Sequence, residues 1–361
     1  MALGLKPEDV TYHNTYLGGG FGRRAVPNAD YIVDAVHAAK GEPWPVMTLW
    51  AREDDIRMGN YRPMHMNKVR VALDEHGDIT AFESKLVGQS ILSGTLLSGF
   101  IKDGIDPFMV EGLATHHYDI QNNDIQIYTV ELPVVPLWMR SVGHTHTAPV
   151  VECIIDEAAH VAGKDPIEYR INLLTGRRMA RVIHGAWKWG IPRVARVAHH
   201  DNGEPSNSND YLGFRLASAL EDVARNSGWN ERSKEANVGY GVAVVESFKS
   251  IVAQVAKVRV HGNQFQVEKV WCSVDCGFAF NPLNVENQMM SGIHFGLGPV
   301  KFSALSIKDG MVEQSNFHDY MVARMSDAPD VEGSIINSGA NPGGIGGVPT
   351  SPIPPGFAPE L

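Results

Sequence analysis

A run of glycines followed by two arginines, at residues 17–24, could hold an anion. Glycine lets peptide N–H groups approach a ligand closely because it has no Cβ, and guanidinium groups then neutralise negative charge. The same run is also typical of a tight turn after a strand, so it leaves both interpretations open. Three more glycine-containing loops occur at residues 140–143, 275–282 and 343–347. Loops so far apart could share only a large ligand, and the alternative is that each is a turn.

Histidines and cysteines with metal-like spacing occur twice. His144 and His146 would share one side of an extended segment, but no third ligand can be identified. Cys272 and Cys276 would need further thiolates or imidazoles at ligand spacing to hold zinc or an iron–sulfur cluster. We therefore predict no metal bound directly by this chain.

Composition limits the class of protein. The chain has 361 residues, enough for two domains, and a formal net charge of -10. This charge disfavours nucleic acid as a partner, because binding phosphates needs a basic surface. No apolar run reaches the ~20 residues that span a bilayer, and the first residues lack an export signal. We expect a chain that has been cut, or one exported with a partner.

Hydrophobic periodicity predicts an α+β fold made of mixed α/β lobes. In the helix predicted near residue 155, Glu152 and Asp156 are expected to face solvent. Predicted strands cover residues 10–17, 46–50, 69–73, 79–87, 125–131, 239–247, 251–260 and 265–274, and predicted helices cover residues 29–40, 150–162, 165–174 and 211–226, with another beginning after residue 281. We predict a first lobe at residues 1–175, a connecting excursion at 176–210 and a second lobe at 211–361.

Six motifs occur together in a fixed order. They are Gly18-Gly19-Gly20-Phe21-Gly22-Arg23-Arg24, Arg52-Glu53-Asp54-Asp55 with Tyr61-Arg62-Pro63, Val110-Glu111-Gly112, Met139-Arg140-Ser141-Val142-Gly143, Asp156-Glu157-Ala158 with Asp165-Pro166-Ile167-Glu168, and Val274-Asp275-Cys276-Gly277 with Asn281-Pro282. With this set the chain resembles the molybdopterin-binding large subunit of the xanthine dehydrogenase family, of the isoquinoline 1-oxidoreductase beta-subunit type. The resemblance extends over about residues 5–355.

The resemblance implies a molybdenum-dependent oxidoreductase with a molybdopterin cytosine dinucleotide. Such an enzyme hydroxylates an aldehyde or N-heterocycle with oxygen from water, and a carboxylate acts as general base. This chain has no four-cysteine site, so a small subunit with two 2Fe-2S clusters is expected as a separate partner, with a cytochrome c as a candidate electron acceptor. Relatives of this branch suggest a periplasmic location or a periplasm-facing membrane complex.

The resemblance also assigns site residues. Arg140 has two open roles, as an anchor for substrate or pterin or as a donor to nearby carbonyls, and Asn281 could instead cap the helix that begins at Pro282. The cofactor-binding residues it implies are Gly19, Gly20, Phe21, Gly22, Arg23, Arg140, Ser141, Val142, Gly143, Asp275, Gly277, Asn281, Gly344, Ile345 and Gly346, with Phe21 also shaping the substrate pocket.

Two departures from the family pattern matter for function. Gly347 stands where relatives carry the glutamate base, and Glu246 is a candidate substitute or a solvent-facing strand residue. Family subunits are also longer, so a further lobe is expected as a separate polypeptide, or the chain is a fragment or has sequence errors. The alternative function is a non-catalytic relative with an assembly or binding role. A Rossmann dinucleotide site is disfavoured because no acidic residue closes a second strand at the expected distance.

Overall fold

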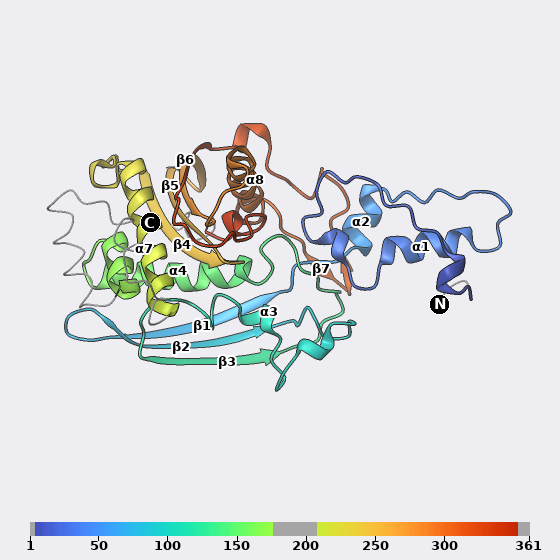
Figure 1. Ribbon diagram of the computed structural model, residues 1–361, viewed down its shortest axis with the longest axis horizontal. Coiled ribbons are helices and arrows are strands. Elements are labelled where there is room, and N and C mark those ends of the chain that lie inside the picture. Colours follow the sequence, from blue (N-terminus) through green and yellow to red (C-terminus); the bar gives the residue numbers. More distant parts are fainter. Residues whose placement is uncertain (1–3, 176–207, 353–361) are drawn as a thin grey trace.

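The computed structural model describes residues 4–175 and 208–352, and all structural statements below refer to them (Figure 1). The helices are α1 (Asp30–Ala39), α2 (Arg52–Met58), α3 (Pro107–Val110), α4 (His144–Val161), an unlabelled helix at residues 166–175, α7 (Ser208–Ser227) and α8 (Pro282–Lys301). The strands are β1 (His65–Leu73), β2 (Ile79–Gly88), β3 (Asn122–Thr129), β4 (Val238–Ser247), β5 (Ser250–His261), β6 (Gln264–Asp275), β7 (Ile307–Lys308), β8 (Met311–Val312) and β9 (Asp330–Ile335). Six short 3-10 helices, η1 to η6, lie between these elements.

The first sheet has the order β1-β2-β3. β1 and β2 form the predicted antiparallel hairpin, and β3 joins β2 in parallel. Asp74 closes the hairpin turn, because its Oδ1 accepts hydrogen bonds from the N–H groups of His76 and Asp78, both at 2.9 Å. Phe82 and Leu86 lie on the same face of β2 and are buried. This face therefore points to the core, as the period of two predicts.

The second sheet has the order β4-β5-β6-β9, with the predicted strands β4, β5 and β6 antiparallel and β9 added in parallel. Alternate residues of β5 enter two different cores. Ile251 and Ala253 face the larger core, and Val252 and Ala256 face the smaller core under α8. Both faces of β5 are buried, which explains its nearly continuous apolar sequence.

The larger core lies between the two sheets, with α4 in the middle (Figure 1). Ile155 of α4, Phe82 of β2 and Val244 of β4 belong to the same cluster of buried side chains. The core therefore crosses the lobe boundary that we predict at 176–210. Residues 176–207 of that segment lie outside the described residues, and residues 208–210 belong to α7, so the division into lobes stays a prediction.

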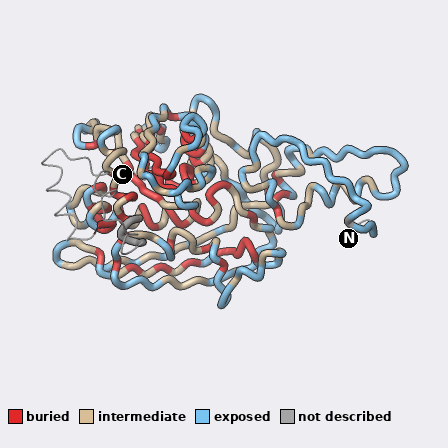
Figure 2. Tube along the Cα trace, viewed as in Figure 1, coloured by how far each residue is buried: buried red, intermediate tan, exposed pale blue. Residues whose placement is uncertain are grey.

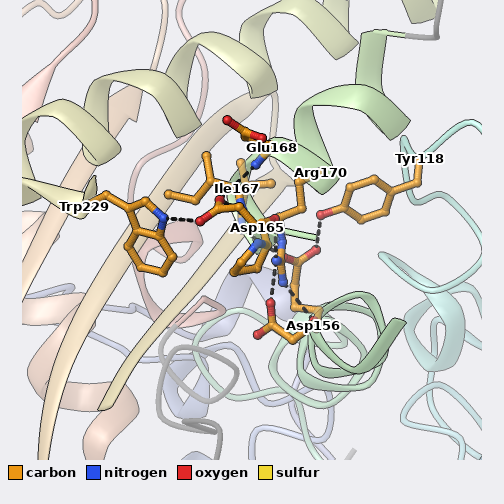
Figure 3. Close-up of polar contacts among 10 residues, drawn as sticks. Tyr118, Asp156, Asp165, Ile167, Glu168, Arg170 and Trp229 are labelled. Carbon is orange, nitrogen blue, oxygen red and sulfur yellow. Dashed lines mark hydrogen bonds and ion pairs between the residues drawn. The ribbon is translucent and has the colours of Figure 1, made fainter. Parts of the chain in front are cut away.

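A buried ion-pair network ties these layers together (Figure 3). Arg170 is fully buried and donates from Nε to Glu152 at 2.9 Å and from Nη1 to Asp156 at 2.5 Å. Glu152 also accepts from the Tyr118 hydroxyl at 2.7 Å and from the N–H of Val244 at 3.0 Å. The expectation that Glu152 faces solvent is wrong, because its carboxylate joins α4 to β4 in the other sheet. The two acidic positions pair with an arginine rather than with water.

Two predicted strands are absent from the described structure. Residues 10–17 and 46–50 have no regular secondary structure and pair with no strand, and their side chains are almost all exposed. The predictions of helix and strand elsewhere are confirmed, although α4 begins six residues before the expected 150. No helix of the described residues is long and apolar enough to cross a membrane.

Two stacked histidines fasten the start of β1 to the first turn of α4. The rings of His65 and His146 lie 3.6 Å apart between centroids and are nearly parallel. Neither ring nitrogen of His65, nor Nε2 of His146, has a hydrogen-bond partner in the described residues. Burial lowers the pKa of His65 to about 4 and that of His146 to about 3, and the Asp106 carboxylate offsets only part of this effect at His65. Both rings are therefore neutral at pH 7.

Arg170→Met should lower the free energy of unfolding by about 3–5 kcal/mol, because it leaves the Glu152 carboxylate buried without its main counter-ion. Arg225→Met is the matched control, since the Arg225 side chain is 67% exposed and its ion pair with Asp222 contributes about 0–1 kcal/mol. Urea unfolding monitored by circular dichroism measures both. Equal effects of the two substitutions would contradict the structural role of Arg170.

The free energy of unfolding should fall as the pH is lowered from about 6.5 toward 4. In this window the unfolded chain protonates His65 and His146, whereas the folded protein does not, because their pKa values are lowered on folding. His65→Phe should make this pH dependence shallower, while His76→Phe, at an exposed position, should leave it unchanged. Unfolding curves at pH 7, 6 and 5 give the slopes, and an unchanged slope in His65→Phe would refute the assignment.

Candidate functional site

The four glycine-containing loops meet in one place. The N–H of Arg140 donates to the carbonyl of Phe21 at 3.0 Å, which joins the first loop to the second. The Arg140 and Ser141 side chains reach the last loop, and the N–H of Gly343 donates to the carbonyl of Cys276 at 3.0 Å. The loops are therefore not four independent turns. The convergence that we treated as one of two alternatives is present in the structure.

Backbone strain also gathers at this junction. A left-handed backbone at a non-glycine residue is costly and often marks a functional site. Eight non-glycine residues of the described chain have such a positive φ, and five of them lie in or beside these loops: Phe21, Ser141, Val142, Phe248 and Lys249.

The first loop is shaped by a close approach of the backbone. Gly22 has φ 94°, and a Cβ there would lie 2.5 Å from the carbonyl oxygen of Trp138, so no other residue fits. Arg23 forms a two-pronged ion pair with Asp30 at 2.9 and 3.0 Å and lies over the Trp50 ring. Arg24 stacks on Tyr31 and has no carboxylate partner among the described residues. Arg23 is therefore neutralised by Asp30, whereas the positive charge of Arg24 is available to a ligand.

The Arg140 side chain, called the Arg140 clamp below, hydrogen-bonds to two other segments of the site. Its Nε donates to the carbonyl of Gly346 at 2.6 Å, and its Nη1 donates to Ser291 of α8 at 2.8 Å. Its Nη2 donates to the side-chain oxygen of Gln288 at 2.9 Å. Of the two roles left open by the sequence, the structure shows the bonding of neighbouring carbonyls. The donors of the guanidinium bind protein oxygens and so position the loop at 343–347. A direct contact of this side chain with the cofactor stays a prediction.

The last loop offers an open backbone surface. A Cβ at Gly346 would meet nothing within 4 Å, and the same holds at Gly18 of the first loop. Ser141 donates its hydroxyl to the carbonyl of Gly347 at 2.5 Å and so holds the backbone of Gly347 in place. Gly347 has an ordinary φ of -108°, and its Cβ would lie 3.3 Å from the N of Ser141 and 3.4 Å from the Phe248 ring. A side chain at residue 347 therefore fits after a small adjustment.

The loop at 275–282 is anchored to α7 by a buried ion pair. Asp275 accepts from Nε of Arg215 in α7 at 2.7 Å and from the hydroxyl of Ser338 at 2.6 Å. Burial alone would raise the pKa of Asp275, but these bonds and the N–H of Gly277 lower it. Asn281 caps α8 through a bond from the N–H of Asn284 at 3.1 Å. The side chains of Asp275 and Asn281 both hydrogen-bond to other protein groups. Their predicted contacts with the cofactor stay predictions.

Phe248 belongs to the site although the sequence does not predict it there. Phe248 and Lys249 are the two turn residues between β4 and β5, with φ of 53° and 66°, a geometry that glycine and asparagine normally supply. The N–H of Gly344 donates to the carbonyl of Phe248 at 2.8 Å. The ring is 52% exposed and faces Gly347. The apolar pattern of the β4 sequence could indicate a turn at its end. Only the folded structure shows that the Phe248 ring faces Gly347.

Arg62 is a second residue that the sequence analysis leaves out of the site. Its Nη2 donates to the carbonyl of Arg140 at 3.1 Å, and its guanidinium lies over the Phe295 ring. It has no carboxylate partner among the described residues, and burial lowers its pKa to about 10. Phe295 stacks in turn on Phe21 of the first loop, with centroids 5.5 Å apart. A partly buried cation without a carboxylate partner beside glycine loops suits an anionic ligand.

Glu246 lies behind the Phe248–Lys249 turn and lines a different cavity from the four loops. Its carboxylate interacts with Nε2 of His117 at 3.4 Å and accepts from the N–H of Lys249 at 2.8 Å. Burial alone would raise the pKa of Glu246, but the bonds to His117 and Lys249 lower it. It lines a separate cavity with His117, Tyr118 and Glu152, and no residue of the four loops lines that cavity. Glu246 supports the strained turn, and its role as a substitute base stays a prediction.

The two histidines near the start of α4 contact different neighbours. His144 and His146 lie in the first turn of α4 rather than in an extended segment, so their rings point to different neighbours. His144 lies 3.4 Å from Glu111 and 3.3 Å from Ser247, and His146 stacks on His65. Within the two described ranges no group of three or more histidine, cysteine or acidic side chains could hold a metal ion.

Comparison with known proteins gives the site its context. Residues 1–173 and 193–329 each match a molybdopterin cofactor-binding domain. The chain is 28% identical over 343 residues to the isoquinoline 1-oxidoreductase subunit beta of Brevundimonas diminuta. This alignment covers 93% of the chain and 39% of that protein. It is also 28% identical over 370 residues to a membrane-bound aldehyde dehydrogenase of Gluconacetobacter polyoxogenes, covering 97% and 44%. The chain thus spans about two fifths of the length of these relatives.

Solved structures show the same fold. Quinoline 2-oxidoreductase from Pseudomonas putida 86 superposes with a TM-score of 0.73 at 12% identity, over 94% of this chain and 64% of that one. The aldehyde oxidoreductase from Desulfovibrio gigas superposes with a TM-score of 0.66 at 14% identity, over 94% and 51%. The predicted α+β fold is confirmed. With two molybdopterin cofactor-binding domains over most of its length, the chain belongs to the molybdenum-binding subunits of the xanthine dehydrogenase family.

Proposed function

We propose that this chain is the part of a molybdenum hydroxylase that holds the cofactor and oxidises an aldehyde or an N-heterocycle. The observation that supports this proposal most strongly is the convergence of four glycine-containing loops around the Arg140 clamp. Relatives that match the chain are named as an isoquinoline oxidoreductase and an aldehyde dehydrogenase. The matches agree in reaction type but differ in substrate.

The residues of the site fit an anionic cofactor. Open backbone at Gly18 and Gly346 provides surfaces that a ligand can approach closely, and Arg62 provides unneutralised positive charge. Arg24 adds a second free guanidinium. When bound, the cofactor supplies the oxygen transfer and accepts the electrons. The chain's own residues bind it, orient it and exclude water from it.

The finer form of the cofactor and its partners belong to the same proposal. We infer the cytosine dinucleotide form of molybdopterin and a separate small subunit with two 2Fe-2S clusters, which passes electrons to an acceptor such as a cytochrome c. The three cysteines of the chain are too few for a cluster site of its own. A relative named as membrane-bound supports a periplasmic or periplasm-facing complex.

Two half-exposed phenylalanines would form the substrate walls. Phe21 is 47% exposed and Phe248 is 52% exposed, and strained backbone fixes both in place. Phe21 packs against the Arg140 guanidinium, and Phe248 faces Gly347, so both rings border the same junction. Flat apolar rings suit an aromatic or small apolar substrate. Gly347 lies between the second ring and Ser141, where a general base would have to act.

Metal and nucleotide analysis tests the proposed function. The chain, purified with the subunits that associate with it, should contain about one molybdenum atom per chain and release CMP on acid hydrolysis. A preparation that contains molybdenum and CMP but oxidises neither aldehydes nor N-heterocycles would instead support a non-catalytic relative. Absence of both would overturn cofactor binding.

Arg62→Met should weaken retention of the cofactor by about 10- to 100-fold, the loss expected for a charge-assisted hydrogen bond. Arg62→Lys should retain more of it because the positive charge is kept. The measurement is the molybdenum content after gel filtration. Arg70→Met serves as the control, because the Arg70 side chain on β1 is 68% exposed and pairs with Glu83 on β2. Normal molybdenum content in Arg62→Met would contradict the role of Arg62.

Gly347→Glu should raise kcat of the molybdenum-loaded complex by about 10²–10⁴, the usual contribution of a general base. The backbone at residue 347 accepts a side chain, as its φ and the Cβ distances show. Gly347→Gln has the same shape without a basic carboxylate and should give no such gain. Steady-state oxidation of an aldehyde with an artificial electron acceptor measures the effect. Equal rates of the two variants would rule out a missing base at this position.

A further inference from the structure

Residue 347 lies between two segments, the loop at 140–143 and the turn between β4 and β5, which are called the two walls here. Each wall contains a strained pair of residues. Ser141 and Val142 have φ of 72° and 46°, and Phe248 and Lys249 have φ of 53° and 66°. A left-handed backbone is costly for such residues, above all for a β-branched valine. Neighbouring groups must therefore hold each pair in place.

The carboxylate of Glu111 holds the end of the first strained pair. Glu111 follows α3, and its Oε1 accepts from the N–H of Gly143 at 2.6 Å. Its carbonyl oxygen accepts from the Thr147 hydroxyl at 2.6 Å, so two groups of one residue bind the start of α4. The helix dipole also favours a carboxylate at the N-terminus of this 18-residue helix. Glu111 therefore fixes the residue that directly follows the strained pair.

The His144 imidazole connects this carboxylate to the other wall. Its Nδ1 lies 3.4 Å from Oε1 of Glu111 and 3.3 Å from the hydroxyl of Ser247, the residue directly before the β4–β5 turn. His144 is 7% exposed and Ser247 is 1% exposed, so water competes little for these contacts. Figure 2 shows that α4, which begins with His144, has buried residues along most of its length. A chain of buried polar contacts therefore joins the two strained pairs.

Both walls contact residue 347 directly. The Ser141 hydroxyl donates to the carbonyl of Gly347 at 2.5 Å, and the Phe248 ring lies 3.4 Å from the place of a Cβ at that residue. A shift of either wall would therefore change the space between them. Binding sites keep their geometry when the groups that form them are themselves fixed by further contacts. Glu111 and His144 provide such contacts for both walls.

We propose that Glu111 and His144 are positioning residues that hold the two walls in one common arrangement. Loss of the Glu111 carboxylate releases Gly143 and, through His144, the turn between β4 and β5. The cofactor is then held less tightly, because both walls border its site. The effect on the backbone is independent of the proposed function, whereas the effect on the cofactor rests on it.

Hydrogen–deuterium exchange of the full chain tests the connection between the walls. Glu111→Ala should speed exchange at least about fivefold at residues 140–147 and also at residues 245–250, since coupling between two sites usually changes an equilibrium by about 5- to 150-fold. Glu111→Gln keeps an oxygen that can accept the Gly143 N–H, so it should retain most of the protection. Faster exchange at residues 140–147 alone would mean that Glu111 only caps α4, and would overturn the proposal.

Ser247→Ala tests the connection from its other end and removes only one hydroxyl group. Because coupling is reciprocal, this variant should speed exchange at residues 140–147 as well as at residues 245–250. Unchanged exchange at residues 140–147 would contradict the connection. Asp74→Ala is the matched control, because the Asp74 carboxylate also accepts two backbone N–H groups, but in the β1–β2 turn beside the other end of α4. It should leave exchange in both segments unchanged.

Molybdenum content after gel filtration tests the effect on the cofactor in the chain purified with its associated subunits. Glu111→Ala should retain at least about fivefold less molybdenum than the unaltered chain, whereas Asp74→Ala should retain the same amount. Faster exchange in both segments with full molybdenum content would overturn the positioning role. An unaltered chain that never contains molybdenum would refute the proposed function instead, and the exchange measurements would still decide whether the walls are connected.

Discussion

The Arg140 guanidinium holds the candidate site together. It reaches the last glycine loop through Gly346 and helix α8 through Ser291 and Gln288, while its backbone N–H holds the first loop. Segments more than three hundred residues apart in the sequence are thereby joined at one cation. Because Arg140 has no carboxylate partner in the described residues, its donors all go to neutral oxygens. The net positive charge that remains at the junction suits the negative charge of a molybdopterin cofactor.

A second buried arginine maintains the scaffold under this junction. Arg170 and Glu152 connect the helix at 166–175 to α4, and Glu152 continues the connection to β4 in the second sheet. The second loop precedes α4, and the strained turn at Phe248 follows β4. The ion pair therefore fixes two walls of the site relative to each other. Family motifs around Asp156 and Asp165 are explained by this structural role rather than by contact with a cofactor.

The sequence predicts those parts of the structure whose pattern is local. The β1–β2 hairpin, the strands β4 to β6 and the helices α7 and α8 all carry regular periodicity, and all are present. Residues 10–17 have the same periodicity but lack a partner strand, which no local pattern can supply. Glu152 looks like a surface residue because its counter-ion, Arg170, comes from another helix. Arg62 stands in one of the family motifs, but its place in the site, like that of Phe248, comes from tertiary contacts that no local pattern shows.

The position of molybdenum in the loaded protein tests the central claim most directly. Crystals of the complex, with X-ray data collected at the molybdenum absorption edge, would locate the metal by its anomalous signal. The account predicts one molybdenum peak beside Gly347 and Phe248, with the pterin in contact with the loops at residues 18–24, 140–143 and 343–347. A molybdenum peak elsewhere, such as in the separate cavity lined by His117 and Glu246, would contradict it.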